Sequence, residues 1–194
     1  MTLKKLLSTA TDKEKFTTIQ NYIDFCSEYL EFIETNLQAV IVSQNENHYQ
    51  FYQYKKEGNY NVSRPINSFL MYDAHQFEKT KKKFKILLSD IHTINPIVRT
   101  ILNNSVYTIQ QSIGATLDAL PATKSNTARK IVGDLFERFI RLLLNEIGID
   151  CTSGVVNIPV VVHGEKTFDF NYQHDLIIKK NGELKAIGSV KTSS

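Results

Sequence analysis

Apolar residues recur at alternating spacings of three and four over residues 12–38. On a helix this spacing gathers them into one stripe, so the pattern predicts a single helix of about seven turns. The acidic residues lie off the stripe, whose members are Phe16, Ile19, Ile23, Cys26, Leu30, Ile33 and Leu37. Such a helix either packs on its own domain or forms a dimer contact.

A dense group of aromatic residues follows between Asn47 and Tyr60, where Tyr and Phe are separated by polar residues. Aromatic side chains are good strand formers, so the group predicts a β-hairpin at about residues 40–62 with one buried face. Aromatics beside lysines would also suit stacking on bases and contact with phosphates. Residues 66–117 are typical of short helices, one of which would have Asn95 as its N-cap and Pro96 as its first residue.

A linker-like passage at residues 121–126 suggests a soft domain boundary near residue 122. The apolar stripe beyond it predicts a long helix that Asn126 or Thr127 caps and Gly148 ends. Residues 155–162 predict a strand at an edge or a bend, because Pro159 lacks a backbone donor. The predicted fold class is therefore α/β (α+β), with a mostly helical region at 1–121 and a long helix followed by a β-sheet at 122–194.

The last apolar runs of the chain flank Asn181-Gly182, and both residues tolerate the positive φ that tight hairpin turns require. Because strand side chains alternate between faces, the loop length decides which polar residues meet. A two-residue loop leaves Ser189 and Lys191 on the face opposite Asp175. A three-residue loop, with Gly182 in the left-handed position of a G1 bulge, brings all three to one face, and we predict this register.

A carboxylate beside an ammonium group at the ends of neighbouring strands suits metal-dependent hydrolysis of phosphodiesters. In that chemistry Asp175 holds a hard cation, while Lys191 steadies charge on the phosphate or the attacking water. Glu137 lies at the edge of the apolar stripe of the preceding helix, one turn from Arg141. It is either a further carboxylate for this site or a solvent-exposed partner of Arg141.

The spacing of Asp175, thirteen residues and then Ser189-Val190-Lys191 resembles the signature of the PD-(D/E)xK nuclease superfamily. The helix at residues 133–148 looks like the first core helix of that superfamily, and the Ser-Val-Lys resembles a variant of type II restriction endonucleases that cut around a CCGG core. The resemblance implies a restriction-endonuclease-like core with a mixed β-sheet and Mg²⁺-dependent hydrolysis of double-stranded DNA, for which a homodimer is suited. It assigns catalytic roles to Asp175, Lys191, Glu137 and Ser189, with Asp175 and Glu137 as metal ligands.

Two residues depart from that signature, and the sequence stops soon after it. His174 stands where the pattern has proline, and Ser189 stands where most members carry an acid, which a later helix supplies in the CCGG cutters. Because the superfamily core continues with another helix and strand beyond the position of Ser194, we expect an incomplete, C-terminally truncated core. The alternative to an endonuclease is a nuclease-fold protein that only binds nucleic acid or a partner chain.

The composition is that of an ordinary globular protein, with 42% apolar and 22% charged residues among 194 and a formal charge of +3. Cys26 and Cys151 have no metal-binding or disulfide spacing, and the motifs of phosphate loops, zinc proteases and serine-hydrolase elbows are absent. No apolar run is long enough to span a membrane, so we expect a cytoplasmic protein. The densest positive charge is either a solvated face or a source of phosphate contacts, and it comprises Lys81, Lys82, Lys83 and Lys85.

Overall fold

The computed structural model describes residues 1–42, 48–54, 62–93 and 95–191. The chain divides into two compact units, Met1–Leu135 and Phe136–Ser193, so the division falls inside the helix α6 (Ser125–Glu146). The sequence placed a soft boundary near residue 122, where a short 3-10 turn, η3 (Ala122–Lys124), precedes α6.

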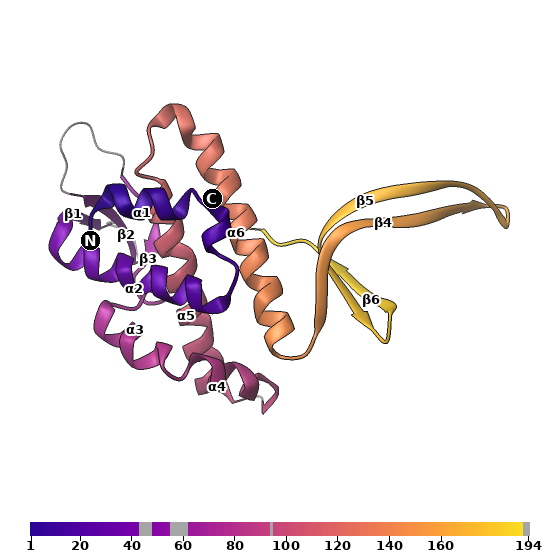
Figure 1. Cartoon of the computed structure of the whole chain (residues 1–194), viewed down its shortest axis with the longest axis horizontal. Coiled ribbons are helices and arrows are strands. Elements are labelled where there is room, and N and C mark those ends of the chain that lie inside the picture. The colour runs from indigo at the N-terminus through magenta and orange to yellow at the C-terminus, as the bar shows by residue number, and fades with distance from the viewer. Residues whose placement is uncertain (43–47, 55–61, 94, 192–194) are drawn as a thin grey trace. The chain divides into compact units, whose positions relative to one another are not determined.

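The first unit is mostly helical (Figure 1). Its helices are α1 (Leu3–Ala10), α2 (Ile19–Asn36), α3 (Ala74–Lys81), α4 (Phe84–Ser89) and α5 (Pro96–Leu117), with 3-10 turns η1 (Lys13–Lys15) and η2 (Asp90–Thr93). The single helix predicted over residues 12–38 is wrong at its start, because a capping box between Thr18 and Asn21 begins α2 at Ile19. Phe16 is fully buried, but it lies in the turn before the helix.

The aromatic group forms a strand whose partner precedes it in the chain. Three antiparallel strands pair in the order β1 (Leu37–Val42), β2 (Tyr49–Tyr54) and β3 (Ile66–Asn67), while residues 43–47 and 55–61 of the predicted hairpin lie outside the described residues. Tyr52 and Tyr54 are buried, and the Tyr54 hydroxyl lies 3.0 Å from the Tyr29 hydroxyl and 3.0 Å from the Ala115 carbonyl oxygen. These two rings are therefore core residues of the unit, not a surface for bases.

Residues 96–117 form one long helix where short helices were predicted. Its start is confirmed, since Asn95 Oδ1 accepts a hydrogen bond from the Ile97 amide at 2.9 Å and Pro96 is the first residue. The buried face of α5 carries hydroxyls that each donate to the carbonyl oxygen four residues earlier, at Ser105, Thr108, Ser112 and Thr116. Hydroxyls satisfied in this way can be buried. Because these buried positions are polar in the sequence, the apolar pattern does not reveal the full length of the helix.

A close approach at Gly114 ties the segment after β2 to α5. The Arg64 guanidinium donates to both carboxylate oxygens of Asp118, with both distances 3.0 Å, and the two side chains are only 18% and 21% exposed. A Cβ on Gly114 would lie 2.5 Å from Cζ of Arg64, so any other residue here would displace the guanidinium from its present position.

The second unit joins the C-terminal part of α6 to a three-stranded antiparallel sheet, in the order β4 (Asp150–Val162), β5 (Glu165–Lys180) and β6 (Glu183–Gly188) (Figure 1). Gly148, with φ of +81°, follows the end of α6 as predicted. Pro159 lies on β4, an edge strand, which is also as predicted. The mixed sheet that the resemblance implies is represented here by antiparallel pairs alone.

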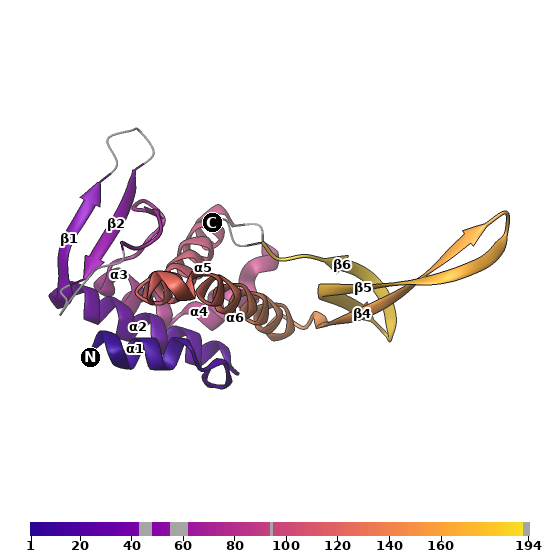
Figure 2. The same cartoon turned by 90° about the horizontal axis from the view of Figure 1, so that it is seen from above.

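The strands β4 and β5 run beyond β6 as a two-stranded ribbon (Figure 2). Three directly opposed pairs line one face of this ribbon, namely Val156 with Tyr172, Ile158 with Phe170, and Val160 with Phe168. We call these six residues the apolar ribbon face.

None of the described helices is both long and apolar enough to cross a bilayer.

Candidate active site around Asp175

The hairpin between β5 and β6 is confirmed at Asn181-Gly182, but the predicted three-residue loop is wrong. Lys180 pairs with Glu183, so the loop has the two residues Asn181 and Gly182, at φ of 55° and 80°. Both are in the left-handed region that such a tight turn requires. With this loop alone, Ser189 would lie on the face opposite Asp175.

A β-bulge in β6 corrects the register. Lys179 pairs with Leu184 while Ile178 pairs with Ala186, which leaves Lys185 as the extra residue. The shifted register continues to the pair of Leu176 with Gly188, and the next positions are Asp175 and Ser189. The two residues therefore face each other, by a route that the sequence prediction did not contain.

The carboxylate of Asp175 accepts two hydrogen bonds on one oxygen. The Ser189 hydroxyl donates to Oδ2 at 2.8 Å, and the Val190 amide donates to the same oxygen at 2.9 Å. Both donors come from the segment that directly follows β6. Within the described part of the chain, no hydrogen bond reaches Oδ1.

A second bulge, in β5, brings α6 into the site. Thr152 pairs with Ile177 and Gly154 with His174, so Asp175 and Leu176 together lie opposite Ser153. A bulge takes a backbone group out of the regular ladder, and here the Arg141 guanidinium donates to the Asp175 carbonyl oxygen at 2.9 Å. Arg141 thereby joins α6 to β5 at the candidate residue.

Glu137 leaves the same face of α6 as Arg141, one turn earlier. Residues four apart on a helix have Cβ atoms about 5–6 Å apart, so Glu137 lies on the side of α6 from which Arg141 reaches Asp175. Its side chain is half-buried, not a fully exposed helix carboxylate. The prediction that Glu137 takes part in the site is consistent with this placement, and its role stays a prediction.

Partial burial of the Asp175 carboxyl acts to raise its pKa, but the Ser189 and Val190 hydrogen bonds and the charges of Lys191 and Arg141 outweigh it. The pKa is therefore held below its ordinary value, and Asp175 is an anion at neutral pH. Lys191 is exposed, and none of the described carboxylates lies within 4.0 Å of its ammonium group. It is close enough to Asp175 for its charge to be felt, yet open to a ligand.

The oxygen donors at this site are of the type that Mg²⁺ takes, but they are not a full set of protein ligands. Mg²⁺ takes oxygen ligands, and proteins commonly hold it with one or two carboxylates while water and substrate phosphates complete the shell. Asp175 Oδ1 and Glu137 are such oxygens. Among the residues that the structure describes, no three His, Cys, Asp or Glu side chains come together as a metal cluster.

No protein-family model and no curated protein sequence matches the chain. The crystal structure of the type IIP restriction endonuclease Kpn2I matches it with a TM-score of 0.56 and 20% sequence identity, over 77% of this chain and 50% of that one. The chain has a restriction-endonuclease-like fold. The predicted fold class is thus confirmed, and the chain spans about half the length of Kpn2I.

Two parts of the site in this restriction-endonuclease-like fold were not predicted from the sequence. The sequence suggests Arg141 only as a partner for Glu137, whereas its guanidinium donates to the Asp175 carbonyl oxygen. The Val190 amide carries no sequence signal, because every residue but proline has one.

His174 directly precedes Asp175, and its ring centroid lies 5.0 Å from that of Tyr172. Its Nε2 is buried and has no hydrogen-bond partner among the described residues.

The predicted lysine cluster belongs to the first unit. Lys81 is half-buried, pairs with Glu78 and donates to the Ser27 hydroxyl at 3.1 Å, so its charge is partly used within the unit. The other three lysines, Lys82, Lys83 and Lys85, are exposed. The prediction that they contact phosphates is not tested by this arrangement.

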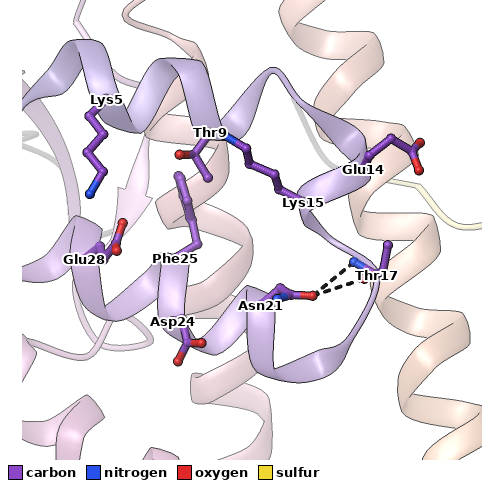
Figure 3. A pocket seen from close by; sticks show the side chains of 9 residues that line it. All are labelled: Lys5, Thr9, Glu14, Lys15, Thr17, Asn21, Asp24, Phe25 and Glu28. Atoms are coloured by element: carbon purple, nitrogen blue, oxygen red, sulfur yellow. Dashed lines mark hydrogen bonds between the residues drawn. The ribbon is translucent and has the colours of Figure 1, made fainter.

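A polar hollow of about 370 Å³ in the first unit lies between α1, η1 and α2 (Figure 3). Lysine and acidic side chains of opposite sign line it side by side, with Phe25 among them. At its edge the Thr17 amide and hydroxyl both lie within hydrogen-bond distance of Asn21 Oδ1. This mixture favours neither an anion nor a cation, so we assign the hollow no part in catalysis.

Proposed function

We propose that this protein hydrolyses phosphodiester bonds of double-stranded DNA as a Mg²⁺-dependent endonuclease of restriction type. One observation carries the proposal. The bulge in β6 sets the Asp175 carboxylate against Ser189 and Val190, directly before Lys191, within a restriction-endonuclease-like fold. An anion held ionised beside an exposed cation, next to a helix that carries Glu137, suits phosphodiester chemistry.

In this proposal each residue has a distinct task. Asp175 Oδ1 and Glu137 hold the metal ion, which when bound supplies positive charge to the phosphate and lowers the pKa of water. Lys191 orients the attacking water and stabilises negative charge as it grows on the phosphate oxygens. Arg141 keeps the strand that carries Asp175 against α6.

A second candidate is a nuclease-fold protein that only binds nucleic acid or a partner chain. The specific observation in its favour is that the described residues hold no cluster of three metal ligands, with Ser189 where an acid is usual. The chain also matches only half of Kpn2I. Under this second candidate the protein binds DNA but does not cleave it.

Plasmid cleavage in Mg²⁺ separates the two candidates. We expect Asp175→Ala and Lys191→Ala each to lower the cleavage rate by at least about 100-fold, as is usual when a group that stabilises a transition state is removed. Asp169→Ala is the matched control, because Asp169 is an exposed acid on the same strand, paired with Lys166 at 2.8 Å. Equal rates for the wild type and Asp175→Ala would contradict the endonuclease proposal.

DNA binding tests the lysine cluster. Lys82 and Lys83 are exposed, so the double charge reversal Lys82→Glu/Lys83→Glu should remove about two phosphate contacts and reduce the slope of log K against log salt by about two. Lys4→Glu/Lys5→Glu on α1 provides a control with the same change in net charge. An equal effect of both pairs would show that only net charge matters.

A homodimer suits an enzyme that cuts both strands, and the apolar ribbon face supports this part of the proposal. Phe168, Phe170 and Tyr172 are 55%, 50% and 54% exposed, and the six residues would together bury roughly 500 Å² per copy. Two copies reach the lower limit of about 1,000 Å² for a specific interface. Sedimentation should show a dimer that Phe170→Asp disrupts and Asn171→Asp, on the other face, does not.

A further inference from the structure

The two hydrogen bonds to Asp175 end on the same carboxylate oxygen. A carboxylate oxygen has two lone pairs, and Oδ2 uses them for the Ser189 hydroxyl at 2.8 Å and the Val190 amide at 2.9 Å. Oδ1 has no such donor among the described residues. The two oxygens of this carboxylate are therefore not equivalent.

We propose that Ser189 is a positioning residue and not a metal ligand: with the Val190 amide it occupies Oδ2 of Asp175, so that Oδ1 alone is presented to the divalent cation. This inference rests on the proposed function and refines it. It replaces the catalytic role that the resemblance assigns to Ser189. Ser189 then acts through Asp175 and does not touch the reacting atoms.

The chemistry of the donors favours this assignment. The Ser189 hydrogen is directed to Asp175, and a neutral hydroxyl is a poorer ligand for a hard cation than a carboxylate oxygen. Outer-shell hydrogen bonds commonly hold a ligating carboxylate in one orientation, and their loss typically lowers metal affinity by 10–100-fold. The register that the β6 bulge creates serves this contact, because it places Ser189 directly opposite Asp175.

Mn²⁺ affinity, measured by calorimetry and by the electron paramagnetic resonance of the free ion, tests the positioning role in the full chain. We expect Asp175→Ala to abolish binding at this site and Ser189→Ala to weaken it by 10–100-fold. Ser189→Thr keeps a hydroxyl at the same position and should return the affinity to within about threefold of wild type. Wild-type affinity in Ser189→Ala, with binding lost in Asp175→Ala, would overturn the positioning role and leave the proposed function standing.

A sulfur substitution separates a ligand from a positioning residue. If an oxygen binds the metal directly, its replacement by a thiol shifts preference from Mn²⁺ toward the softer Cd²⁺. We expect Asp175→Cys to raise the ratio of Cd²⁺ to Mn²⁺ affinity more than tenfold and Ser189→Cys to leave the ratio near that of wild type. A Cd²⁺ preference in Ser189→Cys would show that Ser189 is a ligand and overturn the inference.

Hydrogen exchange of the Val190 amide provides a readout without metal. Its hydrogen bond to Asp175 should slow exchange, so Asp175→Ala should accelerate it at least tenfold. Unchanged exchange would overturn the inference whatever the metal measurements give. Mn²⁺ binding that Asp175→Ala does not weaken would overturn both this inference and the proposed function, so the two failures are distinguishable.

Discussion

Arg141 allows the link between α6 and the candidate site to be tested by stability alone. Its guanidinium donates to the Asp175 carbonyl at 2.9 Å, at the bulge in the pairing of β4 with β5. Arg141→Met keeps a long apolar stem but removes the donor. The carbonyl then loses the hydrogen bond from Arg141, and the helix loses this polar contact with β5.

The magnitude follows from the type of bond. A hydrogen bond from a charged donor contributes about 1.5–3 kcal/mol, and leaving a buried acceptor unsatisfied costs about 1–3 kcal/mol. Arg141 is only half-buried, so solvent offsets part of this loss. We expect the free energy of unfolding of the second unit to fall by about 1–2 kcal/mol in Arg141→Met.

Urea denaturation followed by a probe in the second unit measures this change, with Lys179→Met as the matched control. Lys179 is an exposed cation on β5, and surface substitutions of this kind usually change stability by less than about 0.5 kcal/mol. The unfolding midpoint should therefore shift for Arg141→Met and stay nearly constant for Lys179→Met. Equal shifts for both would refute the argument that the carbonyl contact stabilises the unit.

Three further predictions follow from the same structure. Gly114→Ala should lower the free energy of unfolding by about 1–2 kcal/mol, because the added Cβ displaces the guanidinium of Arg64. In an Arg64→Ala background the same change should instead stabilise α5 by up to about 1 kcal/mol, because alanine favours a helix more than glycine does. A double-mutant cycle in urea measures both effects. Deletion of Lys185 should remove the bulge and keep Asp175 opposite Ser189, so Val190 amide exchange should be unchanged. The pKa of Asp175 is lowered in the folded protein from its ordinary value of 3.8. Ionised Asp175 therefore stabilises the fold above pH 3.8, and this stabilisation disappears as the pH falls through the lower folded pKa. In chemical denaturation the wild type and Asp175→Ala should differ less in stability at about pH 2 than at about pH 6.

The parts of the fold that could be predicted from the sequence are those with a local physical cause. Asn95 and Gly148 mark helix ends because one supplies a side-chain acceptor and the other adopts positive φ. Asn181-Gly182 marks the hairpin for the same reason. Each of these signals is carried by one or two residues and needs no tertiary contact.

The errors arose where tertiary contacts or self-satisfied polar groups override a pattern. The helix predicted from residue 12 begins at Ile19, where a capping box starts it. Phe16 fits the apolar spacing and is buried, but it lies in the turn before the helix. The helix over residues 96–117 was predicted as short pieces, because its buried hydroxyls bond to their own backbone and read as polar. In both cases burial does not coincide with apolar periodicity.

For the hairpin of the candidate site, the sequence predicted correctly which residues share a face of the sheet, but it did not predict the strand register. The predicted loop pairs Asp175 with residue 187, which leaves Ser189 on the same face but diagonal to Asp175, at about 7–8 Å between Cα atoms. The observed loop and bulge place the two residues directly opposite, where neighbouring side chains lie about 4.5–5.5 Å apart and a hydroxyl can reach a carboxylate. Alternation of apolar and polar residues specifies which face a side chain occupies, but a change of register by two residues leaves that alternation unchanged. The sequence therefore predicts that Asp175 and Ser189 share a face, but it cannot predict that they are in contact.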